Sequence, residues 1–68
     1  MNNTFRIRTY GRTELAQLYC PDILPQSAFR KFMSWLRLNP RLRTLAKRRE
    51  RTFTPAQVAR IVKELGEP

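Results

Sequence analysis

Apolar residues recur along this chain with two periods, and the change of period marks where its elements begin. Residues 4–10 alternate between two sides, which predicts a short, half-buried N-terminal strand that ends at Gly11. One side of this strand carries Phe5, Ile7 and Thr9, and the other carries Arg6, Arg8 and Tyr10. A lone strand needs a partner, either residues 51–53 or the same strand of a second molecule.

The first segment with a helical period is short. Thr13 is predicted as its N-cap and Pro21 as its stop, so the helix spans about two turns. Glu14 lies in the first turn, where a carboxylate interacts favourably with the helix dipole. The predicted apolar face carries Leu15, Ala16, Leu18 and Tyr19.

The longest periodic segment begins at Pro25, a residue favoured at the first position of a helix, and ends at Leu38. Its apolar side chains recur at spacings of three and four residues, at Ala28, Phe29, Phe32, Met33, Trp35 and Leu36. The opposite side carries Gln26, Ser27, Arg30, Lys31, Ser34 and Arg37. We therefore predict an amphipathic helix with a cationic outer face.

Two shorter segments complete the pattern. Asn39 and Pro40 are predicted to cap and open a short helix that holds Leu42 and Leu45. Thr54, Pro55 and Gln57 form the capping-box pattern of a last helix, and Gly66 is its predicted left-handed C-cap. The buried stripe of this helix is predicted at Val58, Ile61, Val62 and Leu65. The fold class is then mainly α: one domain over residues 1–68, a compact helix-turn-helix-like bundle of three to four short helices with a short N-terminal β-strand.

Charge directs the interpretation towards nucleic acid. The 68 residues carry 14 Lys and Arg against 5 Asp and Glu, a net charge of +9. Residues 30–51 hold nine of the cations and one carboxylate, so their net charge is 9 minus 1, or +8. Such a density exceeds what solubility requires and repels itself unless an anion lies nearby. Eleven of the 14 cations are Arg, whose planar guanidinium suits phosphates and guanine edges.

The composition also excludes several classes of site. The chain has no His and one cysteine, Cys20, which excludes an intrachain disulfide and a Cys/His zinc site. The carboxylates are too scattered for acid–base pairs, so we expect no enzyme, no cofactor and no small-molecule substrate. The sequence shows neither a signal peptide nor a membrane span, and we expect a cytoplasmic protein.

A short helix, a tight turn and a longer basic helix follow one another as in a helix-turn-helix, whose second helix enters the major groove of DNA. Gln26, Ser27 and Arg30 are predicted to face base edges. Further contacts with phosphates or bases are expected along the basic block. The predicted nucleic-acid-binding set is Gln26, Ser27, Arg30, Lys31, Arg37, Arg41, Arg43, Arg48, Arg49 and Arg51.

Two family resemblances accompany this pattern. Residues 13–16, the basic aromatic helix through Trp35 and residues 53–61 resemble the order of pieces in MerR-type and excisionase-like DNA-binding domains. The segments 7–11, 14–19, 53–55 and the ending Leu65-Gly66-Glu67-Pro68 are similar to a family of small proteins of unknown function from gut Bacteroidales. This second resemblance implies a compact, mostly helical domain. Residues 40–52 lack the glycine and the alternation of a β-hairpin wing, so wing contacts with DNA are not expected.

Several alternatives remain open beside duplex DNA. The basic block is also typical of a solvated surface that keeps a small protein soluble, or of a protein that binds single-stranded RNA. A third alternative is a homodimeric protein-interaction module whose basic patch binds an acidic partner. Binding to a membrane surface ranks last, because the apolar side chains in the segment 32–37 are needed for the core.

Overall fold

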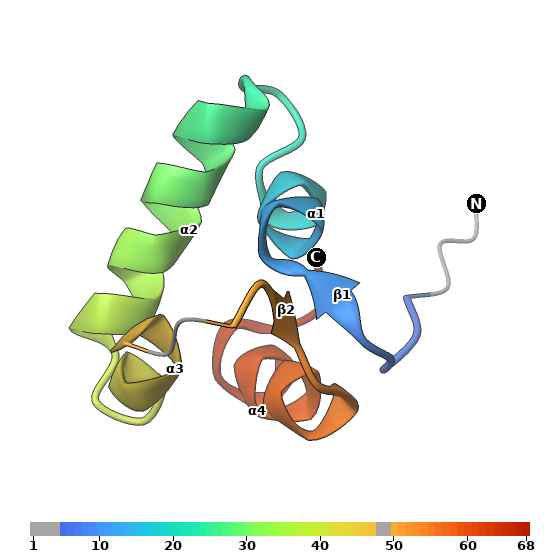
Figure 1. Cartoon of the computed structure of the whole chain (residues 1–68), viewed down its shortest axis with the longest axis vertical. Helices are drawn as coiled ribbons and strands as arrows, with labels where there is room; N and C mark the ends of the chain where they lie inside the picture. The colour runs from blue at the N-terminus through green and yellow to red at the C-terminus, as the bar shows by residue number, and fades with distance from the viewer. Residues whose placement is uncertain (1–4, 48–49) are drawn as a thin grey trace.

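The computed structural model describes residues 5–47 and 50–68, and in this part of the chain it is mainly α with one short sheet, which confirms the predicted fold class. Figure 1 shows the longest helix along one side of the molecule and the two strands between the first and last helices. No helix in the described residues is long and apolar enough to cross a bilayer. The elements are β1 (Tyr10–Gly11), α1 (Arg12–Tyr19), α2 (Pro25–Leu38), α3 (Arg43–Lys47), β2 (Thr52–Phe53) and α4 (Pro55–Leu65).

The sheet pairs a strand near the N-terminus with a strand from the last third of the chain. β1 and β2 are antiparallel, with Tyr10 opposite Phe53, so residues 51–53 supply the partner that the sequence analysis offered as one option. The predicted strand over residues 4–10 is wrong in extent and in facing, because Tyr10 is buried while Ile7 is exposed. The reason is that residues 5–9 fold back over Tyr10. The Phe5 ring stacks on the Tyr10 ring at 5.3 Å, and the Tyr10 hydroxyl donates a hydrogen bond of 2.8 Å to a backbone carbonyl of this segment, that of Arg6.

Helix α1 begins two residues earlier than a cap at Thr13 allows, so the predicted N-cap is wrong. Gly11 is the N-cap, and its N–H donates to the Glu14 carboxylate at 3.0 Å. The strand therefore runs directly into the helix, with Glu14 closing the first turn. The helix ends at Tyr19, before the predicted stop at Pro21. Leu18, predicted on the apolar face, is exposed instead.

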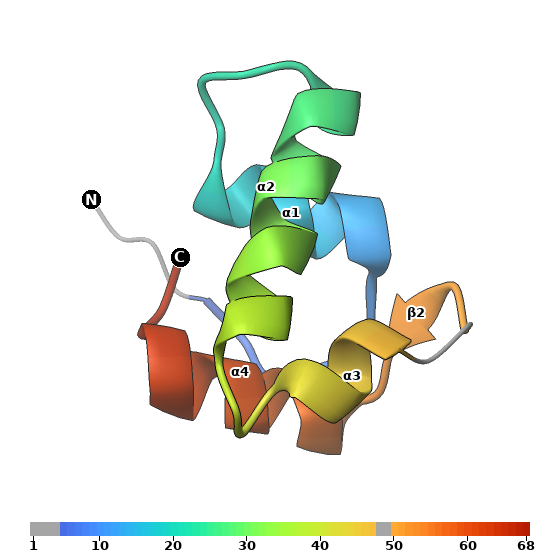
Figure 2. The same ribbon diagram turned by 90° about the vertical axis from the view of Figure 1, so that its left-hand side faces the viewer.

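Helix α2 has the predicted bounds. Figure 2 shows α1 crossing behind it, so that one side of α2 packs inward and the other faces out. Four of its predicted core residues are buried and two are half-buried, and the buried ones are Ala28, Phe32, Met33 and Leu36. The Phe32 ring lies 5.3 Å from Tyr19 of α1 and 6.2 Å from Phe53 of β2, measured between ring centroids. Phe32 therefore fixes α2 against both α1 and the sheet.

The chain makes a turn before α3, so this helix begins at Arg43 rather than directly after Asn39 as predicted. The side-chain oxygen of Asn39 accepts from the Arg41 N–H at 2.8 Å, and its carbonyl accepts from the Leu42 N–H at 3.0 Å. Leu42 and Leu45 are buried, as the pattern predicted. The apolar spacing was therefore correct, although the first turn is not α-helical.

Helix α4 carries every local signal that predicted it. The Thr54 hydroxyl accepts from the Gln57 N–H at 3.3 Å, and the Gln57 side chain accepts from the Thr54 N–H at 2.9 Å. Gly66 ends the helix with a φ of 85°, a conformation that favours glycine. Val58 and Ile61 are buried, so this helix closes the core from below in Figure 1.

Candidate nucleic-acid interface

The polar side of α2 faces away from the core along its whole length. Residues 25–47 contain no Asp or Glu, so nothing neutralises this side from within α2 or α3. The helical period divides the predicted contacts into two flanks. Gln26, Arg30 and Arg37 are spaced four and seven residues apart and share one flank, whereas Ser27 and Lys31 share the other. All five side chains are exposed.

The first flank borders the junction where α1, α2, α3 and β2 meet. Arg30 and Arg37 lie three residues before and four residues after Met33, so they flank it on the same side of α2. The guanidinium of Arg12 reaches this point. Its Nη1 lies 3.9 Å from the Met33 sulfur, its Nη2 donates to the carbonyl of Leu45 in α3 at 3.1 Å, and its Cζ is 4.9 Å from the Phe53 ring centroid.

Sequence reasoning assigned no role to Arg12 beyond its charge. The structure makes it a half-buried connector of four elements. No pattern in the sequence predicts this position, because it depends on how α3 and β2 pack beside the first turn of α1. Arg12 therefore positions the surface that the exposed cations occupy.

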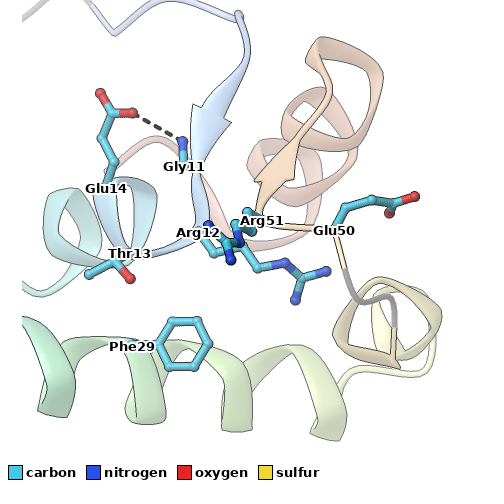
Figure 3. A pocket seen from close by; sticks show the side chains of 7 residues that line it. All are labelled: Gly11, Arg12, Thr13, Glu14, Phe29, Glu50 and Arg51. Carbon is cyan, nitrogen blue, oxygen red and sulfur yellow. Dashed lines mark hydrogen bonds between the residues drawn. The ribbon is translucent and has the colours of Figure 1, made fainter.

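A hollow of about 480 Å³ opens beside this junction (Figure 3). Phe29 of α2 points into it from one side, and the first turn of α1 forms the other. Arg51, which precedes β2, completes the lining, and its carbonyl accepts from the Arg12 N–H at 3.0 Å. The Arg51 side chain is exposed, while Glu50 points away from Phe29 in Figure 3. The fold thus brings Arg51 of the predicted set to the α1 side of α2.

Glu14, one of the two carboxylates that line this hollow beside Glu50, is engaged by partners within the chain. Glu14 accepts from the Gly11 N–H and forms an ion pair with Arg8, with 3.0 Å between Nη2 and Oε2. The hydrogen bond from the Gly11 N–H and, with a smaller effect, the hydrogen bond from Arg8 hold the pKa of Glu14 below its usual value. Glu14 is therefore charged at neutral pH and is balanced by Arg8.

Three of the predicted cations have no carboxylate partner within the described residues. Within the described residues, Arg30, Arg37 and Arg43 take part in no ion pair, and all three side chains are exposed. Figure 2 shows α2 and α3 together on the near side of the molecule. We call this surface the cationic face and define it by Gln26, Arg30, Arg37, Arg43 and Arg51.

Lys31 lies apart from the cationic face. Its ammonium is 5.8 Å from the centroid of the Trp35 ring, and it lines a small hollow with the turn between α1 and α2. Ser27 lies one turn earlier on the same flank. These two predicted contacts therefore sit on the side of α2 away from Arg12 and Arg51.

Arg41 faces α4 rather than the cationic face. Its Nη1 lies 3.9 Å from the Glu64 carboxylate, and its carbonyl accepts from the Arg60 guanidinium at 3.1 Å. Arg60 and Lys63, which are not in the predicted set, line a hollow of about 380 Å³ with Arg41. Their three-residue spacing places them together on the outer side of α4. Arg48 and Arg49 of the predicted set lie outside the described residues.

Comparison with known proteins adds a family and no function. Residues 6–68 match the model of a family described as a domain of unknown function, DUF4248. No curated protein and no solved structure matches the chain.

Proposed function

Because this chain belongs to the DUF4248 family of unknown function, we propose its function from its own surface: it binds nucleic acid, with duplex DNA as the preferred form, through the cationic face. One observation carries this proposal. Arg30, Arg37 and Arg43 are exposed and form no ion pair within the described residues, in a stretch of 23 residues, 25–47, that holds no carboxylate. Uncompensated arginines at this density are typical of surfaces that neutralise phosphates.

The arrangement of α1 and α2 suits a helix-turn-helix mode of binding. Helix α2 has 14 residues and is about 21 Å long, and the major groove of DNA, about 12 Å wide, admits one helix. In this mode Gln26 and Arg30 at its first turns read base edges, while Arg37 and Arg43 hold phosphates. The resemblance to MerR-type and excisionase-like domains supports the same mode.

The contacts would come from helices and not from a wing. In the described residues of the 40–52 segment, the chain forms a turn, α3 and the start of β2, which pairs with β1. We assign Arg51, with Arg48 and Arg49, to electrostatic attraction of the DNA backbone beside α2. Arg41, paired with Glu64, contributes less because its charge is partly compensated.

Burial of the aromatic rings favours duplex DNA over a single strand. Proteins that bind single strands present exposed rings on which bases stack. Here Phe32, Phe53 and Tyr10 are buried, and the other rings of the described residues are half-buried. The large hydrophobic side chains exposed in this part of the chain are aliphatic, such as Leu24 and Leu38.

Fluorescence anisotropy with a labelled duplex at rising salt tests the proposal. If about five phosphates are neutralised, the logarithm of the association constant falls against the logarithm of salt concentration with a slope near −4 to −5. Single-stranded RNA of equal length should compete less well than unlabelled duplex. Absence of binding at low salt overturns the proposal. If single-stranded RNA competes better than the unlabelled duplex, RNA and not duplex DNA is the preferred nucleic acid.

A matched pair of double variants locates the surface. Arg30→Gln with Arg37→Gln and Arg60→Gln with Lys63→Gln each remove two exposed charges and lower the net charge from +9 to +7. The α2 pair should lower the magnitude of the salt slope by about 1.8, because each phosphate contact contributes about 0.9. The α4 pair should change it much less. Equal losses from both pairs would show that total charge alone governs binding.

A further inference from the structure

The flank of α2 opposite Arg30 and Arg37 is apolar and hollowed. Two adjoining hollows share Tyr19 of α1 and Trp35 of α2. The larger, of about 670 Å³, is also lined by Leu38, Leu65 and Pro68, and the smaller, of about 180 Å³, is lined by Ile23. We call this surface the apolar strip and define it by Tyr19, Ile23, Trp35, Leu38 and Leu65. Leu38 is 82% exposed, an unusual position for a leucine beside an aromatic hollow.

Charge is distributed differently here than on the rest of the molecule. The two hollows are lined by Asp22, Glu67 and one cation, Lys31, so the local charge is 1 minus 2, or −1, on a chain of net charge +9. Two copies of such a basic chain repel each other less across this surface than across their basic faces. The molecule measures 34 × 25 × 19 Å, so charges on its far side lie beyond the Debye length of about 8 Å at physiological salt.

The strip is also complementary to itself. In a two-fold dimer the same patch meets itself, so each feature must find its match on the same surface. Lys31 lies in the smaller hollow and Glu67 in the larger, towards the other end of α2. With the two α2 helices antiparallel, Lys31 of one copy lies against Glu67 of the second copy. The exposed Leu38 then enters the hollow beside Ile23 of the second copy.

We propose that the apolar strip is the interface at which two copies of this chain form a two-fold dimer. The cationic face lies on the other flank of α2 and stays open in such a dimer. In Figure 2 the start of α1 and β2 lie to the right of α2, whereas the end of α1 and the C-terminus lie to its left. The dimer does not depend on nucleic-acid binding. It would present two copies of α2 to a partner with the same symmetry.

Sedimentation velocity of the full chain over a range of concentrations, without nucleic acid and in about 0.5 M salt, tests this interface, because high salt suppresses phosphate contacts and leaves apolar contacts intact. Leu38→Glu should weaken dimerisation at least about tenfold, since a carboxylate would then enter the second copy's hollow. Leu24→Glu is the matched control. Leu24 is 73% exposed, it lines neither hollow, and the substitution adds the same charge. Both sites are exposed, and circular dichroism should show that both variants fold.

Charge exchange gives a second readout. Lys31→Glu and Glu67→Lys should each weaken the dimer, and the chain that carries both substitutions should recover most of the loss. A monomer at every concentration up to about 1 mM, where an interface of a few kcal/mol is populated, would overturn the proposal. So would equal effects of Leu38→Glu and Leu24→Glu, or a strip that binds a different protein while the chain stays monomeric. A monomer that still binds DNA would refute the dimer and leave the proposed function standing.

Discussion

At the scale of single residues, the arginines divide into one that holds the fold together and several that face outward. Arg12 donates a hydrogen bond to the Leu45 carbonyl and lies over the Phe53 ring, both in the interior of the molecule. Its substitution Arg12→Met should lower the free energy of unfolding by about 2 kcal/mol, because a charged donor and a cation–π contact are lost and a carbonyl loses its partner. Urea denaturation measures this change.

Arg30→Met is the control for Arg12→Met. It removes the same group from an exposed position and should change the free energy of unfolding by less than about 0.5 kcal/mol. If both variants unfold at the same urea concentration, Arg12 does not connect the elements. Nucleic-acid affinity should respond in the opposite order, with the larger loss for Arg30→Met.

Tyr19 provides a prediction about pH. Its hydroxyl donates to the Gly66 carbonyl, and burial, with a smaller effect from Glu67, raises its pKa to about 12. The folded-state pKa is above the unfolded value of about 10, so the neutral phenol stabilises the fold fully below pH 10 and this contribution is lost between pH 10 and 12. The free energy of unfolding should therefore fall more steeply in this window for the wild type than for Tyr19→Phe. Parallel curves for the two proteins would contradict the assignment.

At the scale of elements, the two threonines that were predicted as N-caps give a direct comparison. Thr54 caps α4 through the Gln57 N–H, whereas Thr13 lies inside α1, which Gly11 and Glu14 close. Thr54→Ala should cost about 1 kcal/mol of unfolding free energy, and Thr54→Ser much less. Thr13→Ala should be neutral or slightly stabilising, because alanine is the better helix former. Thermal unfolding followed by circular dichroism tests both, and an equal loss at Thr13 would restore it as a cap.

The helices could be predicted where their signals are local. Pro25 and Asn39 bound α2, and Thr54 and Gly66 bound α4, each through contacts within one turn. The strand could not be placed in the same way. Tyr10 occupies a polar position in the alternating pattern, and its burial depends on Phe5 folding back and on Phe53 arriving from the far end of the chain.

The same holds for the candidate site: positions that depend on local signals could be predicted, and positions that depend on contacts between elements could not. The exposure of Arg30 and Arg37 could be predicted, because the helical period alone places them opposite the core. The separation of Arg41, which faces α4, from Arg43 at the start of α3 could not be predicted, although only Leu42 lies between them in the sequence. It depends on the turn at Asn39 and on Glu64, which reaches Arg41 from another element.

At the scale of the whole molecule, the same uneven charge that suits the binding of a polyanion is unfavourable for the stability of the fold. Arg30, Arg37 and Arg43 have no carboxylate partner within the described residues, and a chain of net charge +9 repels itself in the folded state. The cationic face is thus a surface whose charge is unfavourable for folding and favourable for binding a polyanion. The unfolded chain is more expanded, so the same charges repel one another less there.

This conflict predicts that removing a cation from α2 stabilises the free protein. Arg30→Gln together with Arg37→Gln should raise the melting temperature at low salt by a few degrees, corresponding to about 0.5 kcal/mol or more, because repulsion falls and no ion pair within the described residues is lost. Salt of about 0.3 M should raise the melting temperature of the wild type and bring the two proteins closer together, since screening removes the same repulsion. Duplex DNA should raise the melting temperature of the wild type more than that of the variant. If the variant melts lower than the wild type at low salt, Arg30 and Arg37 stabilise the fold, and their place in a binding surface loses its physical basis.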